Sequence, residues 1–464
     1  MHRFRSWTLD PPEYRTQRNR LLPIEGGDGS TLNLDFTTGV LDSRLSFIRN
    51  STATYINSSG YVTSIGAAPT NDPTKARFDY DPTSIGTPRG LLIEGQATNL
   101  MFRSQAMNTG PWGINGGTMT ISETGSGSPA NDATSNVVTW TNGTGSGSAW
   151  LQQNVPVSAG NLVVGTAYTW SVWLKSRGGR RVNVFANIQG VTGNREVRVD
   201  FGVSPPTVTS TVATGWTSIQ IPTIVEYPNG WYKVTTGGTL PSGATSVNFG
   251  FNNSDAVPAS GTNGFEAWGY QLEAGSGASS YIPTGASQGT RLRDECSITG
   301  GNFSSWFTNP NEGSFFVQYS LNYPSASMGA GVDRYAFEIS DSLGSSRALC
   351  IAAYRNAPAG RNVRVFNPSG TSFDSGDTLT TSDALNTKFA FGYATANNYI
   401  AAVGVAQPFQ TYNTGSLPTS PAINQMWIGT NRNLSVSTYL FGCIRTIKYW
   451  PTRLPNATLQ GLVS

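Results

Sequence analysis

Few side chains in this 464-residue sequence could carry covalent or metal chemistry. The single histidine is His2, which excludes Ser-His-Asp and Cys-His arrangements and histidine-rich zinc sites, because each of them needs an imidazole in the right place. The three cysteines, Cys296, Cys350 and Cys443, have no zinc-type spacing and are odd in number, so they do not read as a disulfide framework. We expect them to be buried thiols.

A pair of carboxylates could still hydrolyse a glycosidic bond. The nearest candidates are Glu338 and Asp341, but a spacing of three residues places them on opposite faces of a strand. We expect these two acids and Asp333 to lie at a solvated edge and turn, and Asp294 and Glu295 to be solvated in a linker. The sequence therefore predicts that the protein is not an enzyme, with a glycan depolymerase as the less favoured alternative.

Binding a sugar requires fewer specific groups than hydrolysing it. An aromatic ring stacks on the pyranose, and amides, carboxylates and guanidinium groups form hydrogen bonds with its hydroxyls. Residues 168–175, 180–188 and 195–201 alternate apolar and polar side chains, which predicts three half-buried strands. If these strands are neighbours in one sheet, their outward side chains form a carbohydrate-binding platform. The alternative is that Trp173 and Phe185 face a second sheet or a neighbouring domain. The candidate platform residues are Trp173, Phe185, Asn183, Asn187, Arg198 and Asp200.

The sequence predicts no cofactor apart from a possible structural calcium ion, for which carboxylates and backbone carbonyls would be the ligands. Asp255 and Glu273 are candidate ligands, although nothing in the sequence fixes their geometry.

The composition predicts the elements that must position these side chains. Glycine (53) and proline (26) are abundant, charged residues make up only 12%, and aromatic residues reach 11%. This mixture favours many short strands joined by turns, with cores large enough to exclude disorder. The net charge of +3 gives no basic stripe for general nucleic-acid binding. There is no 18-residue apolar run and no signal-peptide core after Met1, so we expect neither membrane insertion nor classical secretion.

Four regions follow from a pass along the chain. We expect residues 1–30 to form an extended basic arm, and residues 31–105 to form a small module of strands and loops wrapped against a neighbour. Residues 106–287 should form a jelly-roll sandwich, and residues 288–464 a second sandwich. The predicted fold is all-β, with tandem antiparallel β-sandwiches after an N-terminal arm. The arm could dock on an acidic protein surface through Arg3, Arg5, Trp7, Tyr14, Arg15 and Arg18.

Several segments resemble tailed-phage virion proteins. One module of such structural proteins resembles three successive segments of this chain: LDFTTGVLDSRLSFIRNSTATYINSSGYV, ARFDYDP and PRGLLIEGQATNL. The segments YTWSVWLKS, NGWYKVTTGG and WGYQLEAGSGASSYIPT resemble a carbohydrate-binding-module-like jelly roll, and FGCIRTIKYWPTRLPNATLQGLV resembles the closing strand of a concanavalin- or laminin-G-like lectin domain. The resemblance covers residues 31–464 and leaves the arm uncovered.

The resemblance implies a fibre, spike or decoration protein of the virion surface, assembled in the host cytoplasm. Its partners would be other virion proteins, held by the arm, and host cell-surface polysaccharide, bound for adsorption without catalysis. A homo-oligomer is possible. A purely structural capsid decoration or connector protein is the alternative.

Overall fold

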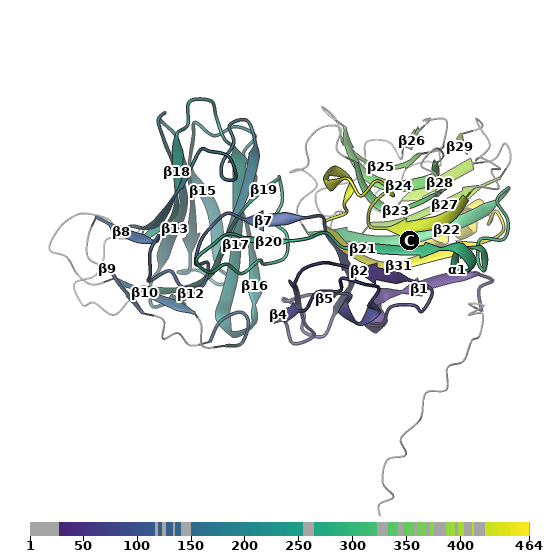
Figure 1. Ribbon diagram of the computed structural model, residues 1–464, viewed down its shortest axis with the longest axis horizontal. Helices are drawn as coiled ribbons and strands as arrows, with labels where there is room; N and C mark the ends of the chain where they lie inside the picture. Colours follow the sequence, from purple (N-terminus) through teal and green to yellow (C-terminus); the bar gives the residue numbers. More distant parts are fainter. Residues whose placement is uncertain are drawn as a thin grey trace, which may run out of the picture.

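The computed structural model contains two antiparallel β-sandwiches side by side, as Figure 1 shows. The all-β prediction of tandem sandwiches is confirmed. The structure describes residues 27–116, 119–122, 127–132, 135–140, 150–253, 264–322, 333–341, 347–356, 360–366, 372–374, 387–394, 398–402, 411–412 and 423–463. The arm residues predicted to anchor the protein, from Arg3 to Arg18, lie outside these ranges. No helix in the described part of the chain is long and apolar enough to cross a membrane.

The jelly-roll sandwich consists of two six-stranded sheets, which we call the β12 sheet and the β13 sheet. In order across the β12 sheet lie β16 (Thr223–Tyr227), β17 (Trp231–Thr239), β12 (Ala167–Arg177), β19 (Gly264–Ala274), β10 (Asn136–Trp140) and β9 (Met119–Ser122). Across the β13 sheet lie β15 (Thr207–Thr214), β14 (Asn194–Asp200), β13 (Arg181–Gln189), β18 (Ser246–Asn253), β11 (Trp150–Pro156) and β8 (Gly113–Asn115).

The predicted alternation along β12 and β13 is confirmed. Trp170, Val172 and Leu174 from one sheet meet Val182 and Val184 from the other in a single buried core. A period of two selects these inward faces, because successive side chains of a strand point to opposite sides.

The second sandwich also consists of two sheets, which we call the β22 sheet and the β23 sheet. The β22 sheet contains β29 (Thr411–Tyr412), β28 (Asn398–Ala402), β27 (Thr387–Tyr393), β22 (Gly313–Leu321), β31 (Gly442–Trp450), β6 (Pro88–Ile93), β5 (Phe78–Tyr80) and β1 (Leu32–Asp35). The β23 sheet contains β2 (Ser46–Ile48), β21 (Glu295–Thr299), β30 (Ile423–Ile428), β23 (Asp333–Asp341), β24 (Arg347–Asn356), β25 (Gly360–Phe366) and β26 (Ser372–Asp374).

Smaller elements complete the chain. A hairpin joins β3 to β4, and β7 pairs with β20 in a two-stranded ribbon that lies between the sandwiches (Figure 1). Within the described ranges there are two α-helices, and both pack on the second sandwich. The bounds are β3 (Ala53–Ile56), β4 (Val62–Ile65), β7 (Ala97–Asn99), β20 (Gly289–Arg291), α1 (Gly300–Ser304), α2 (Asn456–Val463), η1 (Phe36–Thr38), η2 (Pro73–Lys75), η3 (Pro228–Gly230) and η6 (Val436–Thr438).

Four strands between residues 31 and 93, β1, β2, β5 and β6, complete the second sandwich. Leu32 lies opposite Tyr449 in the β1–β31 pair, and Ile93 lies opposite Gly442 in the β6–β31 pair. Phe36 belongs to the same buried core as the C-terminal strands. The neighbour against which this module wraps is therefore the C-terminal sandwich, and the jelly roll is inserted between β6 and β21. The boundaries predicted at residues 105 and 287 stay predictions.

A buried group of charges, which we call the junction network, ties these parts together. It consists of Arg49, Arg77, Glu94, Arg291 and Asp294, whose side chains are 0–1% exposed. The Arg77 guanidinium donates to Glu94 Oε2 at 2.7 Å and also to Asp294. Arg49 Nη1 donates to Asp294 Oδ1 at 3.2 Å, and Arg291 Nε lies 3.5 Å from Glu94 Oε2. Buried charges persist in proteins only when they are paired and hydrogen-bonded in this way.

The junction network also reaches the chain that leaves the jelly roll. The backbone N–H and the hydroxyl of Ser280 donate to the two oxygens of Glu94, at 2.7 and 2.6 Å. Ser280 follows β19, whereas Glu94 follows β6. The network therefore links the exit segment of the jelly roll to the second sandwich.

Three acids that the sequence analysis placed in solvent are buried instead. Asp294 is 0% exposed because it pairs with Arg49 and Arg77. Glu338 and Asp341 are 0% and 1% exposed, and both contact Arg432, through its backbone N–H and its guanidinium respectively. Those predictions were wrong, because groups far away in the sequence compensate the burial of these acids: arginine side chains pair with Asp294 and Asp341, and a backbone N–H donates to Glu338. Cys296 and Cys443 are buried free thiols, as expected.

We expect the junction network to make the fold sensitive to acid. Burial alone would raise the pKa of Glu94, but the charges of Arg291 and Arg77 and the hydrogen bonds from Ser280 outweigh it and hold this pKa at about 2, against an ordinary value of 4.5. An acid with a depressed folded-state pKa contributes stability that is present above the unfolded-state pKa and is lost as the pH falls towards the folded-state pKa. The contribution of about 3 kcal/mol should therefore fade between pH 4.5 and 2, with about 2 kcal/mol gone at pH 3.

Urea unfolding at pH 6 and pH 3 measures this effect. The wild-type protein should lose about 2 kcal/mol more than the variant Glu94→Gln between the two pH values. Equal losses in the two proteins would mean that Glu94 does not carry the acid sensitivity.

Candidate carbohydrate-binding face

The outer face of the β13 sheet is a flat array dominated by amide side chains, which we call the amide face. Four adjacent strands, β11, β18, β13 and β14, each present alternate residues on this side, opposite to the buried core. The amide face consists of Trp150, Gln152, Asn154, Asn183, Phe185, Asn187, Asn194, Glu196, Arg198, Asn248, Gly250 and Asn252.

The register aligns these residues in rows that run across the strands. In the first row, Trp150, Asn252, Asn183 and Arg198 stand opposite one another on successive strands. Directly paired side chains of antiparallel strands lie about 4.5–5.5 Å apart at their Cβ atoms, so neighbouring side chains within a row lie close together. The middle row contains Gln152, Gly250, Phe185 and Glu196, and the third row contains Asn154, Asn248, Asn187 and Asn194.

Hydrogen bonds along the rows fix the amides in place. Asn183 Nδ2 donates to Asn252 Oδ1 at 3.0 Å, and Arg198 Nε donates to Asn183 Oδ1 at 3.4 Å. In the third row, Asn154 Nδ2 donates to Asn248 Oδ1 at 2.7 Å. Side chains that are already oriented lose less conformational entropy when a ligand binds. The rows are therefore preorganised for a ligand rich in hydroxyl groups.

Trp150 is the half-buried aromatic residue at one end of the first row. Asn252 lies opposite it on β18, and the exposed Asn115 of β8 lies on its other side. A partly exposed indole beside amides is the combination that sugar stacking requires. The sequence analysis did not single out this tryptophan, although its alternation with the buried Leu151 was a signal that could have placed it on an outer face.

Phe185 lies at the centre of the amide face, but only 4% of it is exposed. Its cross-strand neighbour is Gly250, which has no side chain, and its other neighbour is Glu196. Phe185 therefore belongs to the predicted face but presents little ring surface to a ligand. Of the predicted amides, Asn187 is exposed, whereas Asn183 is 6% exposed.

Arg198 and Asp200 lie on β14 at the edge of the amide face, and both are partly exposed. Arg181 Nε donates to Asp200 Oδ2 at 2.8 Å, and the backbone N–H of Gly202 donates to its other oxygen at 2.7 Å. The hydrogen bond from Arg181 is the main cause that lowers the pKa of Asp200. The carboxylate is therefore ionised and anchored.

Trp173 is not part of the amide face, which corrects the prediction that placed all six residues on one platform. It lies on the β12 sheet, whereas the other five lie on the β13 sheet. Residues 178–180 carry the chain from β12 to β13 in the opposite sheet. The alternation of apolar and polar side chains indicates which side of a strand is buried, but it does not indicate to which sheet the strand belongs.

The surroundings of Trp173 match the alternative in which it faces a neighbouring domain. It is 1% exposed, and its ring lies 5.2 Å from Trp268, 5.5 Å from Tyr281 and 5.7 Å from Tyr227, between ring centroids. Val62, from the β3–β4 hairpin, belongs to the same buried cluster. Trp173 therefore packs at the junction of the two sandwiches.

The structural calcium ion stays a prediction. Asp255 lies outside the described residues. Glu273 is buried, and its oxygens accept hydrogen bonds from Ser279 and Gln271. Burial raises the pKa of Glu273 above its ordinary value despite these bonds. Within the described ranges, no group of three His, Cys, Asp or Glu residues is placed to hold a metal ion.

Taken together, these elements define a tandem β-sandwich protein with an amide-rich outer sheet face. No protein-family model and no curated protein matches the sequence.

Some solved structures show a distant likeness. Domain 4 of a GH43 extracellular arabinanase from Geobacillus stearothermophilus, solved with arabinotriose, is 13% identical, with 40% of this chain and 82% of that chain covered and a TM-score of 0.27. Domains LG4-5 of the mouse laminin alpha1 chain are 9% identical (66% and 88% covered, TM-score 0.18). Trypanosoma rangeli sialidase in complex with sialic acid is 9% identical (71% and 60% covered, TM-score 0.28). All three TM-scores are low, so the likeness to these structures is remote.

Proposed function

We propose that the protein binds carbohydrate through the amide face and does not act on it chemically. The observation that carries this proposal is the alignment of hydrogen-bonded amides on four adjacent strands, with the half-buried Trp150 at the end of one row. Amide groups both donate and accept hydrogen bonds, as sugar hydroxyls require. A flat sheet face suits an extended polysaccharide better than it suits a small enclosed ligand.

The spacing of the carboxylates supports binding without catalysis. Glu196 and Asp200 are the acids on β14 beside the amide face, and they lie four residues apart on one strand. At roughly 3.3 Å per residue they are about 13 Å apart, which exceeds the roughly 5–9.5 Å between the carboxyl groups of most glycosidases. Glu196 also accepts a hydrogen bond from the Thr211 hydroxyl at 3.0 Å.

The biological setting we propose is the surface of a phage-like virion. The resemblance of residues 31–464 to tailed-phage fibre and decoration proteins supports it. In this setting the basic arm would bind other virion proteins, and the amide face would bind host surface polysaccharide without contacting nucleic acid or entering a membrane. A single shallow sugar site binds weakly, but many copies on one particle, or in a homo-oligomer, multiply the avidity.

Binding of the full-length protein to polysaccharide fractions from the host surface tests this function. We expect the wild-type protein to bind one fraction and the double variant Asn154→Ala/Asn187→Ala to bind it at least about tenfold more weakly, equivalent to about 1.4 kcal/mol. Both side chains are exposed, so their removal should leave the fold intact.

Three outcomes would overturn the proposal. If folded protein binds no host fraction, a purely structural decoration or connector role is favoured. If the double variant binds as well as wild type, the site lies elsewhere. Release of reducing ends from the bound glycan would instead identify a depolymerase.

A further inference from the structure

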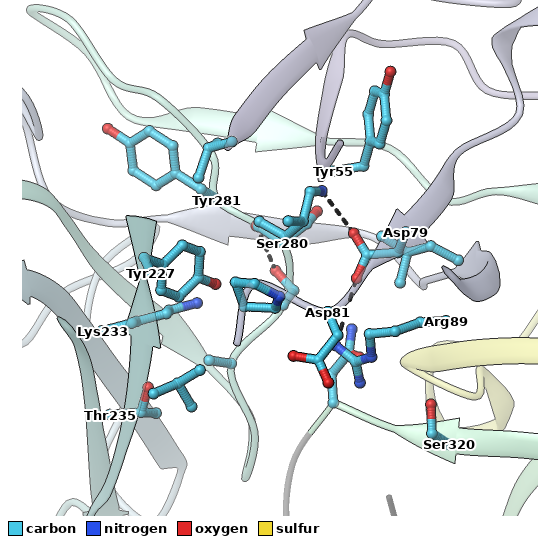
Figure 2. A pocket seen from close by; sticks show the side chains of 18 of the residues that line it. Tyr55, Asp79, Asp81, Arg89, Tyr227, Lys233, Thr235, Ser280, Tyr281 and Ser320 are labelled. Carbon is cyan, nitrogen blue, oxygen red and sulfur yellow. Dashed lines mark hydrogen bonds and ion pairs between the residues drawn. The ribbon is translucent and has the colours of Figure 1, made fainter. Parts of the chain in front are cut away.

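A second feature suited to binding is a cavity of about 500 Å³ between the two sandwiches. This volume lies within the roughly 300–1,000 Å³ range of small-molecule sites. Figure 2 shows Tyr227, Lys233 and Thr235 on the jelly-roll side, and Asp79, Asp81 and Arg89 across from them. The cavity also contacts residues at the surface, such as Thr83, Thr87 and Ile221, so it opens to solvent.

The charges lining the cavity are three cations and two acids, Asp79 and Asp81 against Arg89, Lys233 and Arg445. Four of these five groups already have protein partners. Asp79 accepts the Ile56 N–H at 2.6 Å and lies 3.5 Å from the Arg89 guanidinium, which also donates to Asn322 at 3.1 Å. Asp81 accepts from the backbone and hydroxyl of Thr83, at 2.8 and 2.7 Å, and Arg445 donates to the carbonyl of Pro88.

Lys233 is the exception. Its Nζ lies 4.6 Å from the centre of the Trp173 ring, and among the residues the structure describes it makes no hydrogen bond and no ion pair. A cation over an aromatic face is held in position but keeps its hydrogen-bond donors available. Among the described residues the ammonium is therefore held over the Trp173 ring without an ion pair, although the charges of Glu273, Glu94 and Asp79 act on it from beyond ion-pair distance.

The rest of the lining is rich in hydroxyl groups. Thr223 and Thr235 come from the jelly roll, whereas Thr83 and Ser320 come from the second sandwich. Tyr55 and Tyr227 add aromatic surface with polar tips. Such a lining suits a ligand that combines hydroxyl groups, an apolar ring face and one negative charge.

Burial shifts the pKa of two charged groups in the wall of the cavity. Burial raises the pKa of Asp79 despite the opposing charge of Arg89, which makes its negative charge less favourable. Burial also lowers the pKa of Lys233, although the charges of Glu273, Glu94 and Asp79 counteract this. A carboxylate placed beside Lys233 would stabilise its charged form.

We propose that this cavity binds an acidic monosaccharide unit, with Lys233 as the counter-ion of the ligand's carboxylate. The site is separate from the amide face, because its jelly-roll wall belongs to the β12 sheet and the amide face belongs to the β13 sheet. The proposal therefore does not depend on the function proposed above.

Calorimetric titration of the full chain with glucuronate and with glucose tests the proposal, because these probes differ only in the carboxylate. We expect glucuronate to bind and glucose to bind at least about tenfold more weakly. Lys233→Met keeps the aliphatic stem over Trp173 and should weaken glucuronate binding at least about tenfold, whereas Lys233→Arg should retain most of it. Lys75→Met, outside the cavity on η2, is the matched control and should bind like wild type.

Two results of these titrations would contradict the proposed acidic-sugar site, and a third would redefine its ligand. The proposal is overturned if glucuronate does not bind at millimolar concentration, or if Lys233→Met binds it as wild type does. Inorganic phosphate that binds as tightly as glucuronate would mean a general anion site without sugar recognition. Trp150→Ala should leave glucuronate binding unchanged, which separates this test from that of the amide face.

Discussion

Replacing Arg77 by methionine should lower the free energy of unfolding by about 3–5 kcal/mol, which is the usual cost of breaking a buried ion pair from one side. Arg77 donates to Glu94, to Asp294 and to the hydroxyl of Ser280, and neither acid is exposed to water. Without this guanidinium the two buried carboxylates keep only Arg49 and Arg291 as cationic partners among the described residues. Urea unfolding followed by tryptophan fluorescence measures the loss.

The matched control is Arg293→Met. Arg293 Nε also lies 2.8 Å from a carboxylate, that of Glu295, but its side chain is 45% exposed. Exposed pairs contribute roughly 0–1 kcal/mol, so this variant should unfold almost as wild type does. If Arg77→Met were no less stable than Arg293→Met, the junction network would not hold the two sandwiches together as inferred.

Replacing Trp150 by alanine should weaken polysaccharide binding at least about tenfold, the largest single effect we expect on the amide face. Truncating an aromatic anchor commonly costs more than about 1 kcal/mol of binding free energy. The ring is half-buried at the end of a row of amides, so its loss removes the apolar platform but leaves the hydrogen bond from Asn183 to Asn252 within the row. Affinity gel electrophoresis with the bound polysaccharide measures the change.

Two further variants separate loss of the ring from loss of structure. Trp150→Phe keeps an aromatic ring and should restore most of the binding. Tyr80→Ala removes a half-buried aromatic residue of β5 in the other sandwich and should bind like wild type. Unchanged binding by a folded Trp150→Ala protein would remove this residue from the site.

The prediction of the amide face succeeded where it depended on the strand alone. Asn183, Phe185 and Asn187 share the outer side of β13 because successive residues of a strand point to opposite sides. It failed for Trp173, because three residues are enough to carry a chain from one sheet of a sandwich to the other. Trp150 was not predicted as a site residue, because its row neighbour Asn252 is about a hundred residues away in the sequence. Only the pairing of β11 with β18 brings the two side chains together.

The sequence by itself determined the all-β class, the inward and outward sides of the central strands, and the scarcity of catalytic side chains. These properties follow from composition and from a period of two, which act over a few residues. Only the tertiary structure decided that β1 pairs with β31 at the other end of the chain, and that Asp294 is buried against Arg49 and Arg77. It also decided that a cavity with a positioned lysine lies between the sandwiches. Such contacts join segments far apart in the chain, and their free energy depends on partners that no local pattern reveals.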